Sequence, residues 1–233
     1  TGVDATRFYG DNNPLFNSTV TGGNLVGADT LAGIGVTTSS AATATSNVGT
    51  YNITPSGILA NYLPTYISGT LTVDQRPITI TGVDATRFYG DNNPLFNSTV
   101  TGGNLVGADT LAGIGVTTSS AATATSNVGT YNITPSGILA NYLPTYISGT
   151  LTVDQRPITI TGVDATRFYG DNNPLFNSTV TGGSLVGADT LAGIGVTTSS
   201  AATATSNVGT YGITPSGILA NYLPTYISGT LTV

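Results

Sequence analysis

The sequence predicts a mainly β protein built from three tandem copies of one domain. The segment TGVDATRFYGDNNPLFNSTV begins at Thr1, Thr81 and Thr161, so the chain repeats every 80 residues. β-Branched Thr, Val and Ile are abundant, whereas the helix-favouring residues Lys, Glu and Met are absent. A period of this length suits a small domain with its own core better than a solenoid turn. We expect domains over residues 1–73, 74–153 and 154–233, arranged end to end as an elongated rod.

The copies are almost identical in sequence, and this bears on function. An enzyme seldom gains from identical active sites in series, whereas a spacer or a multivalent binder gains directly from copy number. The repetition therefore favours a structural or binding role. The two variable positions hold Asn24, Asn104 and Ser184, and Asn52, Asn132 and Gly212.

The middle copy is complete, and its first half is expected to form two strands. Residues 78–81 alternate apolar and polar side chains, as a half-buried strand does. After a bulge at Gly82, residues 83–89 continue in extended form. Residues 90–94, GDNNP, have the composition of a tight turn. Residues 95–101 then form the second strand.

The second half of the copy is expected to contain one short helix and further strands. Apolar residues spaced three apart within 105–111 predict a helical turn. Residues 115–124 are rich in Thr, Ser and Ala and suggest edge-like strands. Residues 128–134 alternate as a strand, and 139–153 form a long strand or hairpin.

The junctions between copies are short. Only Asp154, Gln155 and Arg156 separate the last strand of one copy from the first strand of the next, and Pro157 holds Arg156 extended. A flexible linker would be longer and richer in Gly and Ser, so we expect semi-rigid junctions. The first copy lacks the counterpart of residues 74–80. The predicted junction residues are Val73, Asp74, Gln75, Arg76, Pro77, Val153, Asp154, Gln155, Arg156 and Pro157.

Composition points to a protein outside the cell. Only 7% of residues are charged and the net charge is −6, so neither nucleic acid nor an anionic membrane surface is an expected partner. The chain has no Cys and a Thr-, Ser- and Asn-rich surface composition, which favours a bacterial surface repeat over a cytosolic protein. No segment has the ~18 consecutive apolar residues of a membrane span. We expect a monomer whose targeting and anchoring segments lie outside this sequence.

Catalysis is not expected. The chain has no His, Glu, Cys or Lys to act as a general base or nucleophile. Paired aspartates can hydrolyse glycosides, but Asp84, Asp91 and Asp109 lie in turn-like or surface patterns. The absence of Lys also excludes Lys–Asn isopeptide crosslinks. We therefore predict that the protein is not an enzyme and needs no cofactor.

Calcium binding is an alternative role for some of the aspartates. Ca²⁺ prefers six to eight oxygen ligands from carboxylates, carbonyls and amides. Asp91 and Asn92 in the turn, or Asp154 with Asp164 across a junction, could supply some of them. A plain Asx turn explains the same residues without a metal and is the favoured interpretation.

Aromatic and arginine side chains recur in each copy and admit two interpretations. Exposed aromatic rings can stack on sugars, whereas buried rings supply the core that an 80-residue β-domain needs; the core is the favoured interpretation. Arg76 and Arg87 are expected to pair with an aspartate or stack on a tyrosine. The recurring aromatic residues of the middle copy are Phe88, Tyr89, Phe96, Tyr131, Tyr142 and Tyr146.

Five motifs in order resemble the MBG repeat family of the YGX type. They are RPITI at 76–80, YGDNNP at 89–94, LVGADTL at 105–111, SNVGTYNIT at 126–134 and NYLPTYISGTLTV at 141–153. The resemblance implies a β-grasp-like α+β unit with at most one short helix, related to mucin-binding modules. It also implies a large secreted or surface bacterial protein, often a haemagglutinin-like adhesin. The resemblance does not assign binding residues to this chain.

Two functions follow from these observations. In the first, the repeats are a stalk that projects a distal binding domain of an adhesin from the cell, for example in cell adhesion or biofilms. In the second, each repeat binds a host or matrix glycan weakly and several copies add avidity. Neighbouring repeats of the same chain are the expected partners in either case.

Overall fold

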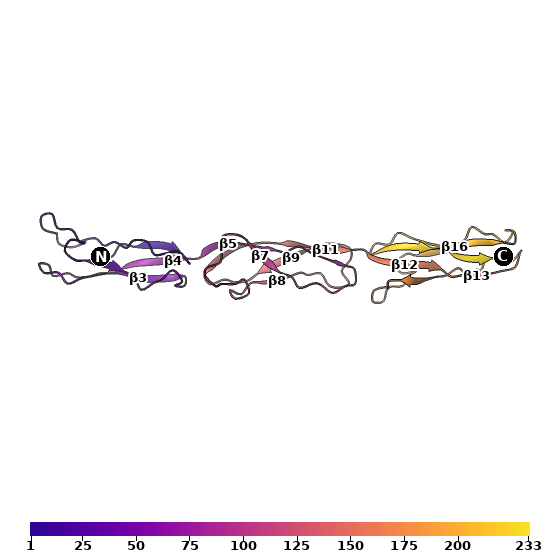
Figure 1. Cartoon of the computed structure of the whole chain (residues 1–233), viewed down its shortest axis with the longest axis horizontal. Coiled ribbons are helices and arrows are strands. Elements are labelled where there is room, and N and C mark those ends of the chain that lie inside the picture. Colours follow the sequence, from indigo (N-terminus) through magenta and orange to yellow (C-terminus); the bar gives the residue numbers. More distant parts are fainter. The chain divides into compact units, whose positions relative to one another are not determined.

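The structure, a computed structural model, describes residues 1–233 and is entirely β (Figure 1). The strands of the first repeat and of the first part of the second are β1 (Ala5–Phe8), β2 (Thr37–Ser39), β3 (Gly49–Ser56), β4 (Gly69–Asp74), β5 (Arg76–Gly82), β6 (Ala85–Phe88), β7 (Ser98–Gly102) and β8 (Thr117–Ser119). The remaining strands are β9 (Gly129–Ser136), β10 (Tyr142–Ile147), β11 (Gly149–Asp154), β12 (Arg156–Gly162), β13 (Ala165–Thr166), β14 (Ser178–Gly182), β15 (Thr197–Ser199), β16 (Thr210–Ser216), β17 (Tyr222–Ile227) and β18 (Gly229–Thr232).

The chain divides into two compact units that do not coincide with the sequence repeats. The N-terminal unit comprises Thr1–Gly82, Ser98–Thr118 and Thr134–Ser148. The C-terminal unit comprises Val83–Asn97, Ser119–Ile133 and Gly149–Val233. Each unit therefore joins parts of the second repeat to one flanking repeat, and each contains one repeat junction.

The third repeat lies wholly in the C-terminal unit and shows the architecture of a complete copy. Its first sheet has the order β14-β12-β17, with β12 antiparallel to β14 and parallel to β17. Its second sheet has the order β13-β18-β16-β15, in which only the β13–β18 pair is parallel. The repeat is thus built from two mixed sheets, and β12 and β18 are inner strands.

Both sheets recur in the second repeat, and the four-stranded sheet recurs in the first. The N-terminal unit contains the sheets β1-β4-β3-β2 and β10-β5-β7. In the C-terminal unit β11 pairs with β6 in parallel and with β9 antiparallel. Pro77 is tolerated on the inner strand β5 because β7 pairs with β5 only from Thr79 onward.

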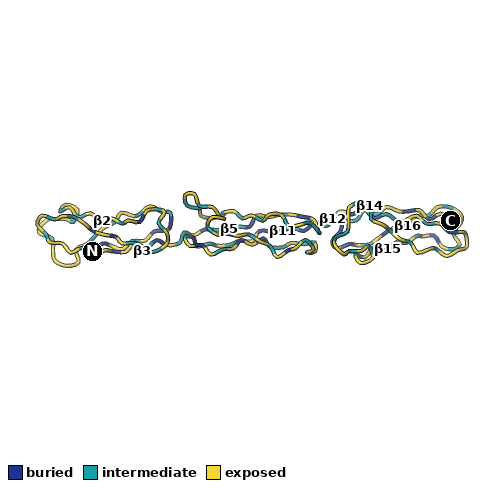
Figure 2. Tube along the Cα trace, turned by 90° about the horizontal axis from the view of Figure 1, so that it is seen from below, coloured by how far each residue is buried: buried dark blue, intermediate teal, exposed yellow.

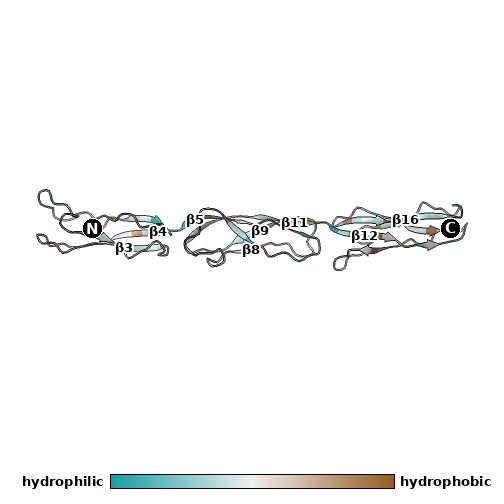
Figure 3. Ribbon diagram, viewed as in Figure 1, coloured by the Kyte–Doolittle hydropathy of each residue, from teal (hydrophilic) through white to brown (hydrophobic).

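The cores follow from strand alternation. In β4 Leu71 and Val73 are buried while Thr70 and Asp74 face outward. Dark blue and yellow segments lie along the tube in Figure 2, and brown segments mark the most apolar parts of the strands in Figure 3. One apolar cluster of the N-terminal unit joins residues of the first repeat, such as Leu71, to residues of the second, such as Ile78. The core of this unit therefore continues across the repeat junction.

The expected helix is absent, and the β-grasp-like α+β prediction is wrong. Residues 105–111 and those after them form consecutive turns, in which the amide of Asp109 donates to the carbonyl of Val106 and that of Ile114 to Thr110. Gly107 and Gly115 have φ of +58° and +92°, a left-handed conformation that interrupts a right-handed helix. The mainly-β part of the prediction holds, but the sheets have no helix packed on them.

The first repeat lacks the sheet that β10, β5 and β7 form in the second repeat and that β14, β12 and β17 form in the third. Residues 62–67 form no strand, whereas their counterparts β10 and β17 pair in parallel with β5 and β12. In this structure no inner strand lies beside residues 62–67. Regular β-structure there depends on pairing, because the sequence of the segment is identical in all three copies.

The structure contains no helix that is long and apolar enough to cross a membrane.

Candidate functional site: the repeat junction

The two repeat junctions are the sites at which the structure concentrates specific polar contacts. At the first junction β4 ends at Asp74 and β5 begins at Arg76, so Gln75 is the one residue between two strands of different sheets. The Gln75 side-chain amide donates to the carbonyls of Leu139 and Ala140 at 2.9 and 3.3 Å. These hydrogen bonds fix the short connection between β4 and β5 to the second repeat.

Arg76 links the two repeats directly. Its Nε donates to the carbonyl of Tyr9 at 2.6 Å, and its Nη2 forms an ion pair with Asp11. Its backbone amide donates to the carbonyl of Asn141 at 3.0 Å. The ion pair is only partly shielded, with the two side chains 19% and 46% exposed, so by itself it contributes about 0–1 kcal/mol. Its main effect is directional, because a guanidinium donates in fixed directions.

Two tyrosines and one aspartate form the centre of the junction. The Tyr9 ring of the first repeat meets the Tyr142 ring of the second edge to face, with centroids 5.5 Å apart and planes at 79°. Both hydroxyls donate to Oδ2 of Asp109, Tyr142 at 2.6 Å and Tyr9 at 3.2 Å. The Tyr142 hydroxyl also accepts from the amide of Val106 at 2.8 Å. One carboxylate thus ties side chains from both repeats together.

Burial and the aspartate keep these hydroxyls protonated. Burial, and next the hydrogen bond to Asp109, raise the pKa of Tyr142 to about 12. The pKa of Tyr9 is also raised, first by burial and then by the negative charge of Asp109. Tyr222 at the second junction likewise has its pKa raised to about 12, and its partner is Asp189.

We expect the protein to lose stability between about pH 10 and 12. Unfolded tyrosine ionises near pH 10, whereas Tyr142 and Tyr222 in the folded protein hold their protons to about 12. Because the folded state binds more protons in this window, the free energy of unfolding is unaffected below about pH 10 and falls above it. Urea unfolding across this range measures the slope. The double variant Tyr142→Phe/Tyr222→Phe should have a shallower slope, and an unchanged slope would contradict the assignment.

A glycine lets the two repeats approach closely. Gly10 has φ of +86°, and a Cβ atom there would lie 2.3 Å from Cγ2 of Val106. Gly90 makes the same approach to Val186 at the second junction. Val106 and Val186 therefore fill the space that a side chain at Gly10 or Gly90 would occupy.

One asparagine at each junction forms hydrogen bonds with the preceding repeat. Asn141 accepts from the amide of Val48 at 3.0 Å and donates to Oδ1 of Asn47 at 2.9 Å. Asn221 makes the same two contacts with Val128 and Asn127. The arrangement is therefore reproduced at both junctions.

Tyr169 in the third repeat provides an internal reference, because it makes no contact with a neighbouring repeat in this structure. Tyr9 and Tyr89, at the two junctions, are 7% and 6% exposed, whereas the equivalent Tyr169 is 60% exposed. The strand β13 also has two residues where β1 and β6 have four. Contact with the following repeat therefore buries this tyrosine and extends the strand before it.

The second arginine of each copy is buried and supports the turn. Arg87 donates from Nε to Oδ1 of Asn93 at 2.8 Å and from Nη1 to the carbonyl of Phe88 at 3.1 Å. It also donates to the carbonyl of Thr123. The expectation of an aspartate or tyrosine partner therefore fails for Arg87. Arg76 does pair with an aspartate.

Three of the four calcium candidates lie in one surface hollow. Asp91, Asn92 and Asp154 line a hollow of about 340 Å³ that also contains Arg87. Asp91 forms an ion pair with Arg156, and Asp164 instead accepts from the amide of Thr230 at 2.6 Å. No three His, Cys, Asp or Glu side chains gather as a metal site. The calcium prediction thus gains no geometric support.

The predicted junction residues lie at the end of β4 and the start of β5, and at the end of β11 and the start of β12. Sequence reasoning missed the partners that these residues meet across the junction. The sequence predicts a helical turn that includes Asp109 and a tight turn that includes Gly90, and neither prediction indicates a contact across the junction. The spacing of about 100 residues between Tyr9 and Asp109, reproduced between Tyr89 and Asp189, is not visible as a local pattern.

Comparison with known families gives one result. The family model of the MBG domain, YGX type, matches residues 1–72, 78–152 and 158–232. The three matches cover nearly the whole chain and confirm the resemblance found in the sequence. No curated protein matches the chain.

Proposed function

The chain belongs to the MBG domain family of the YGX type, and we propose that its repeats are spacers in the stalk of a bacterial cell-surface adhesin. In this role the repeats carry a distal binding domain away from the cell, and their number sets its distance. The coarser conclusion, a protein made of tandem family repeats, follows from the family match alone.

The observation that carries the proposal is the construction of the junction. A spacer must pass the orientation of one repeat to the next, which a flexible linker does not do. Here a single residue, Gln75, separates strands of two sheets, and one apolar cluster continues from one repeat to the next. Arg76, Asp109 and Asn141 add directional contacts between the two sides. Bending at this point would break several contacts together.

The alternative, a multivalent glycan binder, is less well supported. Tyr89, Tyr142 and Tyr222 are buried at or near the junctions, where they cannot stack on a sugar. Phe88 is partly exposed beside Asp91 and Pro94, but the hollow there also contains the charged side chain of Arg87. Catalysis has no support either, because the titratable side chains of the junction are used for structural contacts.

Small-angle X-ray scattering of the 233-residue chain, with calcium and with chelator, tests the spacer proposal. Three domains of about 30 Å in series predict a maximum dimension above about 90 Å. We expect one such value in both buffers, because Asp91 and Asp164 already have protein partners. A smaller or broadly distributed dimension would contradict a stiff spacer. A dimension that depends on calcium would contradict metal-independent junctions.

A further inference from the structure

The first and last strands of a repeat run side by side in the same direction. In the third repeat β12 pairs in parallel with β17, beginning with Arg156 opposite Tyr222. Farther along the chain β13 pairs in parallel with β18, with Ala165 opposite Leu231. In both sets of pairs, here called ladders, the two partners lie 66 positions apart in the sequence. One register therefore holds through both sheets of the repeat.

The second repeat has the same two ladders with the same register. In the N-terminal unit β5 pairs in parallel with β10, and the amide of Arg76 extends this ladder by donating to the carbonyl of Asn141 at 3.0 Å. In the C-terminal unit β6 pairs in parallel with β11, and the amide of Tyr89 extends it by donating to the carbonyl of Asp154 at 2.9 Å. Each ladder thus continues beyond its strands.

An aspartate and two glycines keep the strands in contact between the ladders. In the third repeat Oδ1 of Asp164 accepts from the amide of Thr230 at 2.6 Å, where backbone pairing is interrupted. Asp84 makes the equivalent contact in the second repeat at 2.7 Å. A Cβ atom at Gly162 would lie 2.8 Å from the amide nitrogen of Gly229, so the two backbones approach closely there.

The path of the chain determines how tension acts on these ladders. Tension enters the second repeat at Arg76, the first residue of β5, and leaves it at Asp154, the last residue of β11. In each ladder the first strand is therefore pulled from its N-terminal end and the last strand from its C-terminal end. Because the strands are parallel, these ends lie at opposite ends of the ladder. The strands are pulled past each other, so their hydrogen bonds share the load and break together.

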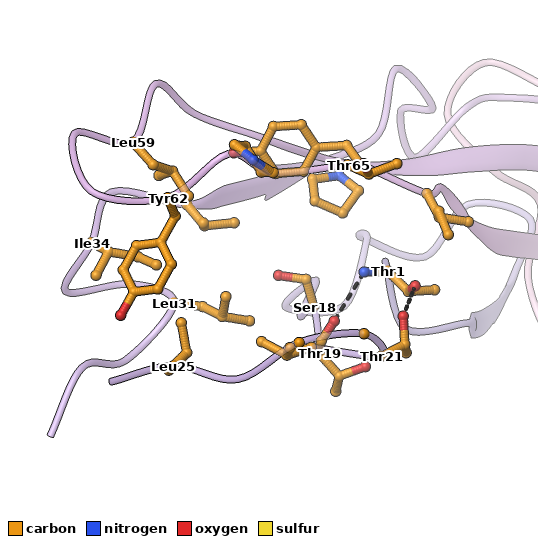
Figure 4. A pocket seen from close by; sticks show the side chains of 18 of the residues that line it. Thr1, Ser18, Thr19, Thr21, Leu25, Leu31, Ile34, Leu59, Tyr62 and Thr65 are labelled. Atoms are coloured by element: carbon orange, nitrogen blue, oxygen red, sulfur yellow. Dashed lines mark hydrogen bonds between the residues drawn. The ribbon is translucent and has the colours of Figure 1, made fainter. Parts of the chain in front are cut away.

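The first repeat shows what happens to the last strand without its partner. Residues 62–67 have the sequence of β10, but no strand lies beside them and they form none. They line a pocket of about 550 Å³, where Figure 4 shows Tyr62 and Thr65. Separation of β5 from β10 is therefore expected to remove the strand structure of β10 as well, which makes the loss of the ladder cooperative.

We propose that the repeats bear tensile load, and that the parallel ladders between first and last strands are the load-bearing elements. This function goes beyond that of a spacer, because a stiff array need not resist being pulled apart. It requires no ligand and no contact with another protein. The load is tension along the chain, transmitted from one repeat to the next through the short connections at Gln75 and Gln155.

The test is single-molecule force spectroscopy of the 233-residue chain through handles on introduced cysteines, since the chain has none of its own. Handles at Asp74→Cys and Asp154→Cys pull the ladders of the second repeat from opposite ends. Handles at Asp74→Cys and Ile138→Cys pull the β5–β10 ladder from one end, because Gln75 donates to the carbonyl of Leu139, next to Ile138. All three handle positions are exposed.

We expect a severalfold higher unfolding force with the first pair of handles at the same loading rate. With the second pair the hydrogen bonds of the ladder break one after another. The 80 residues between Asp74 and Asp154 have a contour length of about 260–290 Å when extended, which identifies the event. Equal forces with both pairs would overturn the load-bearing function. Such a result, together with the expected scattering dimension, would contradict this function alone and leave the spacer proposal in place.

Two proline variants locate the load in the β6–β11 ladder. The amide of Tyr89 donates to β11, and residues two apart face the same neighbour, so the amide of Ala85 faces β11 and that of Thr86 faces away. Ala85→Pro should raise the unfolding rate at a given force roughly two- to tenfold, the effect of one lost hydrogen bond. Thr86→Pro should leave the rate unchanged, because proline is tolerated at an outward-facing edge position. Equal rates for the two variants would overturn the role of this ladder.

Discussion

Replacing Gly90 with alanine is expected to lower the free energy of unfolding by about 2–5 kcal/mol, because it forces the second junction apart. Two effects add. The φ of +86° is unfavourable for any residue with a Cβ atom, at about 1–2 kcal/mol. The new methyl group would also lie 2.3 Å from Val186, and overpacking of this kind costs about 1–3 kcal/mol.

Gly170→Ala separates the two effects. Gly170 is the same residue in the third repeat, with φ of +91°, but nothing lies within 4 Å of its Cβ position. This variant should therefore show only the backbone effect of about 1–2 kcal/mol. Calorimetry and urea unfolding of both variants measure the difference. Equal losses would mean that the repeats do not meet at Gly90.

Strands were the part of the fold that the sequence predicted well. Alternation around Ile78 and Ile80 identifies β5, because an inner strand with one face in the core repeats every two residues. The short Asp-Gln-Arg connection also predicts the strand-to-strand junction at Gln75. Both features are local, and the residues that determine them are adjacent in the sequence.

The helix prediction failed for a physical reason. Leu105 and Leu111 do pack against the core of the N-terminal unit, so their spacing reflects burial. Spacing alone does not distinguish a helix from two successive turns that point the same side chains inward. Gly107 and Gly115 both have positive φ, which interrupts a right-handed helix and produces turns instead. A segment of seven residues is also too short to form a stable helix by its own propensity.

The partners across the junction could not be predicted because they depend on how sheets pack. Tyr9 and Asp109 are 100 residues apart, and their contact exists only when β4 and β5 belong to different sheets with a common core. Identical copies add a further ambiguity, since Tyr9 could in principle meet Asp29, Asp109 or Asp189. Only the three-dimensional structure selects Asp109.

Tyr142→Ala is expected to lower the free energy of unfolding by about 3–5 kcal/mol, as for other large buried aromatic residues. Its side chain is almost completely buried, meets the Tyr9 ring and makes hydrogen bonds with Asp109 and Val106. Removal leaves a cavity in the core that both repeats share. Urea unfolding of the variant and the parent protein measures the loss.

Tyr62→Ala is the matched control. Tyr62 makes the same two hydrogen bonds, with Asp29 at 2.6 Å and Val26 at 2.8 Å, but it has no ring partner and no strand like β5 beside it. Its loss should be clearly smaller than that of Tyr142→Ala, because the two hydrogen bonds of Tyr62 are exposed to solvent. A loss equal to that of Tyr142→Ala would mean that neither the ring pair nor the strand β5 adds to the stability of the junction.

A double-mutant cycle on Tyr9 and Tyr142 then isolates the contact between repeats. Each residue also packs within its own repeat, so the single losses combine effects inside and across the junction. The coupling between Tyr9→Ala and Tyr142→Ala should be about 0.5–1.5 kcal/mol, the range for an edge-to-face aromatic pair. A stiff spacer requires such a favourable interaction energy between neighbouring repeats. Zero coupling would therefore show that the two rings are neighbours without holding the junction together.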